Sequence, residues 1–250
     1  MTCLHGKTAF ISGGSRGIGL AIAQRLAKDG VNLMISASNQ AHLEVVANDL
    51  QARSTARVSS HSGDLRSLAG CETAFAAHQD EYSVCDILIH SAVATKGRIF
   101  PTQPDEDFID GFALKFHAGV RLSHLFWPML KLAKGNVIMI VGGAARTPDH
   151  TFMVGSSVNA ALANYSKALA GQGLLDDVNV NWISPGQTET SRLQNLLARR
   201  AEDEGKTVDA VRQERIQNEG IRRLGRPEDI AELVCFLCGD KSSIEMCAVS

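Results

Sequence analysis

A glycine-rich turn near the start of the chain carries the clearest chemical signal in the sequence. It reads SGGSRGIG from Ser12 to Gly19 and lies between an apolar run and an amphipathic stretch. Glycines allow a tight turn and a close backbone approach, and free N–H groups at a helix start attract phosphate. We expect a dinucleotide pyrophosphate site, rather than a purely structural turn, formed by Gly13, Ser15, Arg16, Gly17, Ile18 and Gly19.

The second apolar run ends without the carboxylate that would select NAD(H). The sequence there reads ISASNQ from Ile35 to Gln40, so no acidic side chain is available to a ribose 2′-hydroxyl. Arg16 is placed to meet a 2′-phosphate, and Ser38 and Asn39 offer further donors. These residues favour NADP(H) over NAD(H) as the cofactor. The alternative for Arg16 is an ion pair with a surface carboxylate.

The elements that would position this turn are short apolar runs that alternate with amphipathic helical patterns. Unbroken β-rich runs of this kind indicate a parallel sheet covered on both faces, and right-handed crossovers make it doubly wound. We therefore expect an α/β fold of the Rossmann type, with helices on both faces of the sheet, in a single domain over residues 1–250. The runs are 7–12, 31–37, 57–64, 85–92, 135–143 and 178–186.

A highly charged segment, residues 188–222, follows the Ser184-Pro185-Gly186 turn. Open α/β sheets bind ligands at the carboxyl ends of their strands. The segment is thus interpreted as a helical flap over that edge. A solvated pair of surface helices explains the charge pattern equally well.

The composition excludes several classes of partner. The net charge is −2 and 44% of residues are hydrophobic, so no basic excess points to nucleic acid or to an anionic membrane. We expect a small-molecule substrate. The N-terminal sequence lacks the pattern of a signal peptide and no apolar run is long enough to span a membrane, which favours a cytoplasmic location.

Cysteine usage fits the same picture. The six cysteines are scattered along the chain, and without a secretory signal they are expected to be reduced thiols. Cys235 and Cys238 form a C-x-x-C within an apolar helical stretch. We interpret this pair as buried helix packing rather than a redox or metal site, and no metal site is expected elsewhere.

Over essentially its whole length the chain resembles the short-chain dehydrogenase/reductase family. The motifs that carry this resemblance are Ser12-Gly13-x-x-x-Gly17-Ile18-Gly19, Asp64-Leu65, Asp86-Ile87-Leu88-Ile89, Val180-Asn181-x-x-Ser184-Pro185-Gly186, and Arg223-Leu224-Gly225-Arg226-Pro227-Glu228-Asp229-Ile230-Ala231. The resemblance implies a strand order 3-2-1-4-5-6-7, with the seventh strand in residues 244–250. It also implies a homodimer or homotetramer built through the helices around residues 105–130 and 156–173.

The resemblance also implies roles for individual residues. Asp64 and Leu65 would contact the adenine, although Asp64 is otherwise interpreted as a helix N-cap. Ser91 and Ala92 occupy the end of the fourth strand, where the family's backbone approaches the cofactor. The nicotinamide end would be held by Pro185, Gly186, Thr188 and Thr190, with ordinary turn chemistry as the alternative for Pro185-Gly186.

The positions that carry catalysis in this family hold other residues here. The family uses a tyrosine as acid/base, a lysine four residues later, a serine that polarises the carbonyl and an asparagine in the preceding helix. Counting along the matching motifs puts Gly155 at the tyrosine position, Asn159 at the lysine, Gly142 at the serine and Lys115 at the asparagine. The chain thus resembles a divergent member that lacks the usual Ser, Tyr and Lys.

Lys115 and Asn159 are the candidate catalytic residues of such a rebuilt site. A partly desolvated lysine can donate or relay a proton near neutral pH, and Asn159 can keep the ribose hydrogen bond. Ser156 or Ser157 would help to serve the substrate. The two glycines would enlarge the pocket, which fits a bulky substrate or one that brings its own acidic group.

Three functions follow from these residues. The first is an NADP(H)-dependent oxidoreductase with a non-standard active site for a carbonyl, alcohol or enone substrate. The second is a catalytically silent NADP(H)-binding protein that senses the cofactor or pairs with an active relative. The third is non-redox chemistry, such as elimination or isomerisation, with the cofactor site idle.

Two further side chains near the site are interpreted as structural. Tyr165 and Lys167 are two apart on a helix, so they point in different directions and do not form the pair that the chemistry needs. Tyr165 is expected to pack in the core or at a subunit interface. His90, at the end of the fourth apolar run, is expected to be a satisfied hydrogen-bonding residue rather than a proton carrier.

Overall fold

The computed structural model describes residues 4–98 and 100–239. Six parallel strands form one sheet in the order β3-β2-β1-β4-β5-β6. The predicted fold class and strand order are confirmed for these strands, and the seventh expected strand lies outside the described residues. The strands are β1 Thr8–Ser12, β2 Asn32–Ala37, β3 Val58–Ser62, β4 Ile87–His90, β5 Asn136–Ile140 and β6 Asn179–Ile183.

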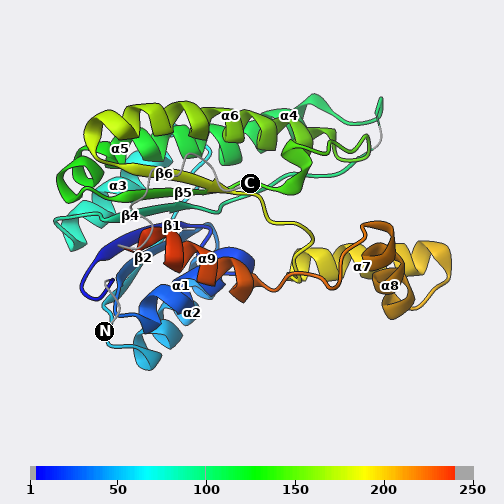
Figure 1. Ribbon diagram of the computed structural model, residues 1–250, viewed down its shortest axis with the longest axis horizontal. Helices are drawn as coiled ribbons and strands as arrows, with labels where there is room; N and C mark the ends of the chain where they lie inside the picture. The colour runs from blue at the N-terminus through cyan, green and yellow to red at the C-terminus, as the bar shows by residue number, and fades with distance from the viewer. Residues whose placement is uncertain (1–3, 99, 240–250) are drawn as a thin grey trace.

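Helices cover both faces of the sheet (Figure 1). One layer contains α1 (Gly17–Lys28), α2 (Gln40–Arg53) and α9 (Pro227–Cys238). The opposite layer contains α3 (Leu68–Glu81), α4 (Asp105–Gly111), a π-helical segment η1 (Phe112–His117), α5 (Ala118–Ala133) and α6 (Met153–Asp176). A short 3₁₀ turn, η2 (Gly143–Ala145), follows β5.

Two apolar cores form because side chains alternate along each strand. In β1, Ile11 faces the core shared with α1 and α9, whereas Phe10 faces the core shared with α3 and α5. Both side chains are fully buried. This two-sided burial explains why the strands read as continuous apolar runs instead of alternating ones.

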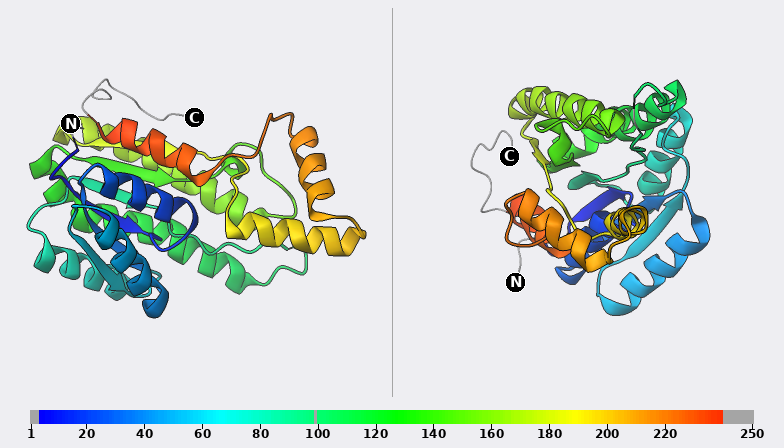
Figure 2. Two further views of the ribbon diagram at one scale, coloured as in Figure 1. Left: turned by 90° about the horizontal axis from the view of Figure 1, so that it is seen from below. Right: turned by 90° about the vertical axis from the view of Figure 1, so that its right-hand side faces the viewer.

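The charged segment after β6 contains two helices, α7 (Ser191–Glu204) and α8 (Val208–Asn218). Both lie beyond the carboxyl ends of the strands and away from the two helical layers (Figure 2). They share a small apolar core of their own, which includes Leu193, Leu197 and Val211. That they close over a bound ligand stays a prediction.

None of the helices in the described part of the chain is long and apolar enough to cross a membrane. The C-x-x-C pair lies in α9, where Cys238 is buried and Cys235 packs against the same core. The Cys235 thiol donates a hydrogen bond to Asp29 Oδ2 at 3.0 Å. Helix packing, as predicted, accounts for both cysteines.

Candidate functional site

The glycine turn links β1 to α1 in a shape that needs glycine. Gly13 has φ +71° and Gly17 has φ +55°, both in the left-handed region. A Cβ on Gly13 would lie 2.9 Å from the Ala92 Cα, so only glycine lets the turn pass the chain that leaves β4. The first turn of α1 has no side-chain cap and no acidic residue. Its free N–H groups therefore suit an anion.

Arg16 lies at the start of α1 with an exposed side chain. No carboxylate in the described part of the chain forms an ion pair with it, so the surface ion pair considered for it is not found among these residues. Ser38 and Asn39 directly follow β2, the strand that pairs with β1. The Asn39 Oδ1 accepts the backbone N–H of His42 at 3.0 Å and caps α2, which leaves its Nδ2 as the available donor.

Asp64 and Leu65 follow β3 at the same edge of the sheet. The Asp64 Oδ1 accepts from the Arg66 backbone N–H and guanidinium at 3.1 and 3.0 Å. Ser67 caps α3 through a 3.0 Å bond from the Gly70 N–H, so the N-cap interpretation of Asp64 is wrong. The Leu65 side chain is buried in the core. A ligand could therefore contact Leu65 only through its backbone.

The chain that leaves β4 is tied to the end of β1. The Ser91 N–H donates to the Ser12 carbonyl at 3.1 Å, and the Ala92 N–H approaches the Ser12 Oγ at 3.4 Å. The Ser12 hydroxyl in turn lies 2.8 Å from His90 Nδ1, and His90 Nε2 lies 2.9 Å from the Lys115 carbonyl. This pattern places the ring proton on Nε2.

His90 is fully buried, and burial lowers its pKa to about 4. Both ring nitrogens have partners, so the prediction of a satisfied structural histidine is confirmed. Its hydrogen bonds connect Ser12, the first residue of the glycine turn, to the backbone of the candidate catalytic lysine. The sequence did not indicate this connection.

Pro185, Gly186, Thr188 and Thr190 lie in the segment that leaves β6. The Pro185 carbonyl accepts the Gly143 N–H at 3.2 Å, and the Thr188 hydroxyl donates to the Gly186 carbonyl at 3.1 Å. Thr190 caps α7 through its hydroxyl, and its Cγ2 would lie 3.4 Å from a Cβ on Gly17. The start of α7 therefore lies against the glycine turn.

Lys115 lies in η1 with only 5% of its surface exposed. Its Nζ donates to the Val141 carbonyl at 2.6 Å, at the carboxyl end of β5. Desolvation by burial, with a smaller contribution from the charge of Arg192, lowers the pKa of Lys115 to about 7. The side chain is thus directed to the edge of the sheet where the cofactor motifs gather, and its ammonium titrates near neutral pH.

Asn159 and Gly142 lie against one another beside Lys115. A Cβ on Gly142 would lie 3.2 Å from both polar atoms of the Asn159 amide. The Asn159 Nδ2 donates to the Gly155 carbonyl at 2.7 Å, whereas its buried Oδ1 has no hydrogen-bond partner among the described residues. The structure therefore brings Lys115, Gly142 and Asn159 together at the end of β5.

The space above Gly155 is already occupied. A Cβ on Gly155 would lie 1.9 Å from the Phe152 ring, so the expectation that two glycines enlarge the pocket is wrong at this position. The ring packs back over the glycine from the turn that precedes α6. The hydroxyl of Ser156, in the first turn of α6, donates to the Phe152 carbonyl at 3.0 Å. Ser157 is exposed.

Sequence reasoning missed two residues of the site, Phe152 and Arg192. Arg192, in the first turn of α7, donates to the Thr95 carbonyl at 2.7 Å, and its Cζ lies 5.5 Å from the Phe152 ring centroid. Arg192 reaches the site from a segment distant in sequence, whereas Phe152 directly precedes α6, and no local pattern indicated that its ring packs over Gly155. The one weak sequence signal for Arg192 is that it directly precedes Leu193, the first buried residue of α7.

The remaining aromatic and apolar groups near the site are structural. Tyr165 packs against the core with its ring centroid 6.0 Å from that of Phe116, and desolvation raises its pKa, so the packing prediction is confirmed.

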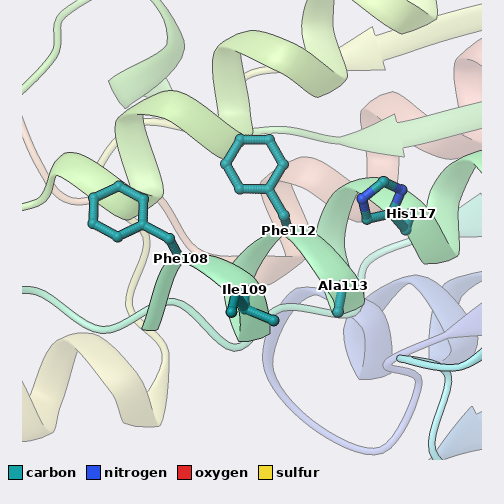
Figure 3. Close-up of a pocket in the computed structure, with 5 residues that line it drawn as sticks. All are labelled: Phe108, Ile109, Phe112, Ala113 and His117. Atoms are coloured by element: carbon teal, nitrogen blue, oxygen red, sulfur yellow. The ribbon is translucent and has the colours of Figure 1, made fainter. Parts of the chain in front are cut away.

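A surface pocket of about 360 Å³ lies along α4 and η1 (Figure 3), and Lys115 is not among its lining residues. Its lining residues are Phe108, Ile109, Phe112, Ala113 and His117.

The geometry can be compared with known proteins. Residues 7–201 match the family model described as short chain dehydrogenase. Over 247 residues the chain is 30% identical to the uncharacterized oxidoreductase YvaG of Bacillus subtilis, covering 96% of this chain and 92% of that protein. It is 27% identical over 243 residues to the NADPH-dependent reductase BacG of Bacillus subtilis, covering 95% and 92%.

A solved structure matches the fold closely. The L-sorbose reductase from Gluconobacter frateurii, complexed with NADPH and L-sorbose, superposes with a TM-score of 0.94 at 26% identity. The match covers 99% of this chain and 95% of that one. The motifs, the strand order and these matches agree, and the chain belongs to the short-chain dehydrogenase family.

Proposed function

We propose that the protein is an NADP(H)-dependent oxidoreductase in which Lys115 exchanges a proton with a small carbonyl, alcohol or enone substrate. One observation carries the proposal. The Lys115 ammonium is buried at the carboxyl end of β5, beside Gly142 and Asn159, with its pKa lowered to about 7 by desolvation. A proton donor and acceptor that titrates near the working pH is suited to both directions of the reaction.

The residues present fit a dinucleotide with a 2′-phosphate. The uncapped first turn of α1 and the glycine turn would hold the pyrophosphate, and unpaired Arg16 would hold the 2′-phosphate together with Ser38 and Asn39. Two similar proteins support this choice. BacG is an NADPH-dependent reductase, and the structure of the L-sorbose reductase is a complex with NADPH. The adenine would lie near Asp64 and the nicotinamide near Pro185, Gly186, Thr188 and Thr190.

The proton step follows from the position of Lys115. NADPH, when bound, supplies the hydride that adds to the carbonyl carbon. The protonated Lys115 then gives one Nζ proton to the developing alkoxide oxygen, which becomes the alcohol, and the amine left behind recovers a proton from solvent. In the reverse direction, the neutral amine accepts the hydroxyl proton.

Asn159 would position the nicotinamide ribose. Its Oδ1 is a buried acceptor that has no partner in the part of the chain that the structure describes, and leaving such a group unmatched costs about 1–3 kcal/mol. A ribose hydroxyl that donates to this oxygen would remove that cost on binding. Asn159 would thus keep the position of the cofactor while Lys115 carries the proton.

The cofactor half of the proposal is tested by calorimetry with NADPH and NADH. We expect NADPH to bind at least about tenfold more tightly than NADH, a difference of ~1.4 kcal/mol. Arg16→Ala should reduce NADPH affinity by a similar factor and leave NADH affinity unchanged, because NADH lacks the 2′-phosphate. Equal affinities in the wild type, or no binding of either, would contradict the assignment.

The catalytic half is tested by following NADPH absorbance with a panel of carbonyl and enone compounds. We expect turnover in the wild type and a loss of about 100-fold or more in Lys115→Met, since general acid catalysis contributes on this scale. Lys167→Met, on the exposed side of α6, is the matched control and should retain activity. Tight NADPH binding without turnover on any compound would overturn the proposal in favour of a catalytically silent cofactor-binding protein.

A further inference from the structure

Arg192 is held over the candidate site by three segments of the chain. It lies in the first turn of α7, two residues after Thr190, whose methyl group lies against the glycine turn. Its Nη2 donates to the carbonyl and the hydroxyl oxygen of Thr95, at 2.7 and 3.1 Å. Its guanidinium also lies 5.5 Å from the centroid of Phe152. These contacts orient a side chain that remains accessible to solvent.

The charge of Arg192 has no counterion in the described part of the chain. Desolvation lowers the pKa of Arg192, and the charge of Arg16 lowers it further. In the same way, desolvation and then the charge of Arg192 lower the pKa of Lys115. Two guanidinium cations and the Lys115 amine are therefore near the site, and no carboxylate of the described residues forms an ion pair with any of the three. Such an excess of positive charge favours the binding of anions.

The side-chain contacts of Arg192 lie outside the glycine turn. Arg16 belongs to the glycine turn, where the pyrophosphate and the 2′-phosphate would bind. Arg192 instead contacts Thr95, beyond β4, and Phe152, whose ring packs on Gly155. Its Nε and Nη1 donors have no acceptor within the described residues and are available to a ligand on this side of the site.

We propose that Arg192 binds an anionic group of the substrate, a carboxylate or a phosphate, so that the preferred substrates are negatively charged carbonyl compounds. This inference rests on the proposed function, because it names the substrate class of the same site. Arginine recognises both groups through charge-assisted hydrogen bonds. Arg192 would select and position the substrate, while Lys115 would exchange the proton.

Calorimetry with matched probes tests this inference without needing turnover. The pairs are levulinate with methyl levulinate, and dihydroxyacetone phosphate with dihydroxyacetone. Each probe is titrated into the protein with and without saturating NADP+. We expect at least one anionic member to bind about tenfold or more tightly than its neutral counterpart, the scale of one charged hydrogen bond.

Variants of α7 assign the preference to Arg192. Arg192→Gln should reduce the affinity for the anionic probe to that of its neutral counterpart, and Arg192→Lys should restore part of the preference. Arg199→Gln is the matched control, because Arg199 is exposed on the same helix farther from the site. NADPH affinity should stay within about twofold in all three variants, a change below ~0.5 kcal/mol.

Three results would overturn the inference: no preference for any anionic probe, a preference that survives in Arg192→Gln, or a loss in Arg192→Gln that falls on NADPH instead of the probe. The last result would mean that Arg192 serves a cofactor phosphate. Failure of the proposed function has a separate signature. In that case NADPH is not bound or not consumed, whatever the anionic probes do in calorimetry.

Discussion

Lys115 is a residue whose surroundings disfavour its own charge. Its Nζ has one hydrogen-bond acceptor, the Val141 carbonyl, and burial is the main reason that its pKa falls to about 7. In the unfolded chain the same amine would stay protonated up to about pH 10.4. The unfolded state therefore binds more protons than the folded state between these values, and folding stability rises with pH in that window.

This linkage predicts the pH dependence of a Lys115→Met variant. The difference in unfolding free energy, wild type minus variant, should increase by up to about 1.4 kcal/mol per pH unit between about pH 7 and 9. Taking the difference cancels other titrating groups, such as Cys235, whose pKa desolvation raises to about 12. Urea denaturation at several pH values measures it. A difference that stays constant with pH would contradict the buried, neutral lysine.

The individual residues of the site differ in how far the sequence could predict them. Counting back from the Ser184-Pro185-Gly186 turn indicates Asn159, because no insertion disturbs the spacing, and counting back from Pro128 indicates Lys115. The collapse of Phe152 onto Gly155 depends on a bulky ring three positions away and on Arg192 from another element. Contacts of this kind depend on tertiary packing, which no local pattern reports.

At the scale of elements, the π-helical segment η1 is the feature that places Lys115. Phe112 and Ala113 of this segment line the surface pocket (Figure 3). Lys115 is buried instead, and its Nζ donates to the Val141 carbonyl. The Lys115 carbonyl accepts a hydrogen bond from His90 Nε2, and His90 Nδ1 also contacts the hydroxyl of Ser12, the first residue of the glycine turn. One histidine thus connects the cofactor turn to the segment that carries the candidate acid.

This connection predicts a large cost for removing His90. His90→Leu loses both hydrogen bonds and leaves buried polar groups unmatched, which should destabilise the protein by about 2–4 kcal/mol. His117→Leu, on the exposed side of the same segment, is the control and should change stability by less than ~0.5 kcal/mol. Chemical denaturation compares the two. Equal, small effects would mean that His90 does not support η1.

The strands were predictable because two-sided burial gives them unbroken apolar sequences. The first helix was predictable because it follows the glycine turn. The π segment was not, since FALKFH is compatible with an ordinary α-helix and its local pattern does not indicate the wider π turn. The helices after β6 were predicted from the charge of the segment and from its position after the Ser184-Pro185-Gly186 turn. Their contact with the glycine turn through Thr190 needed the structure.

At the scale of the whole molecule, apolar side chains remain exposed on the layer formed by α4, α5 and α6. Leu132 is 82% exposed and Leu175 is 79% exposed, near the ends of α5 and α6, and Ile109 on α4 is 62% exposed. Exposed apolar side chains of this kind are candidates for burial at a protein interface. They lie on or near the helices through which the family resemblance implies assembly.

We therefore predict a dimer or tetramer in solution. Light scattering coupled to size exclusion should give two or four times the chain mass at micromolar concentration. A double variant with charges at Ile109 and Leu175 should shift the population toward monomer, because burying unpaired charges at an interface is costly. Leu196→Glu, on α7 away from that layer, should leave assembly unchanged. A monomeric wild type would contradict the prediction.

The central claim, that Lys115 serves the proton at this site, is tested most directly by a crystal structure with NADP+ and a bound carbonyl compound. We predict that the Lys115 Nζ lies about 2.6–3.2 Å from the carbonyl oxygen, directly or through one water, beside the nicotinamide C4. If Lys115 still donates only to the Val141 carbonyl while another side chain contacts that oxygen, the claim is wrong.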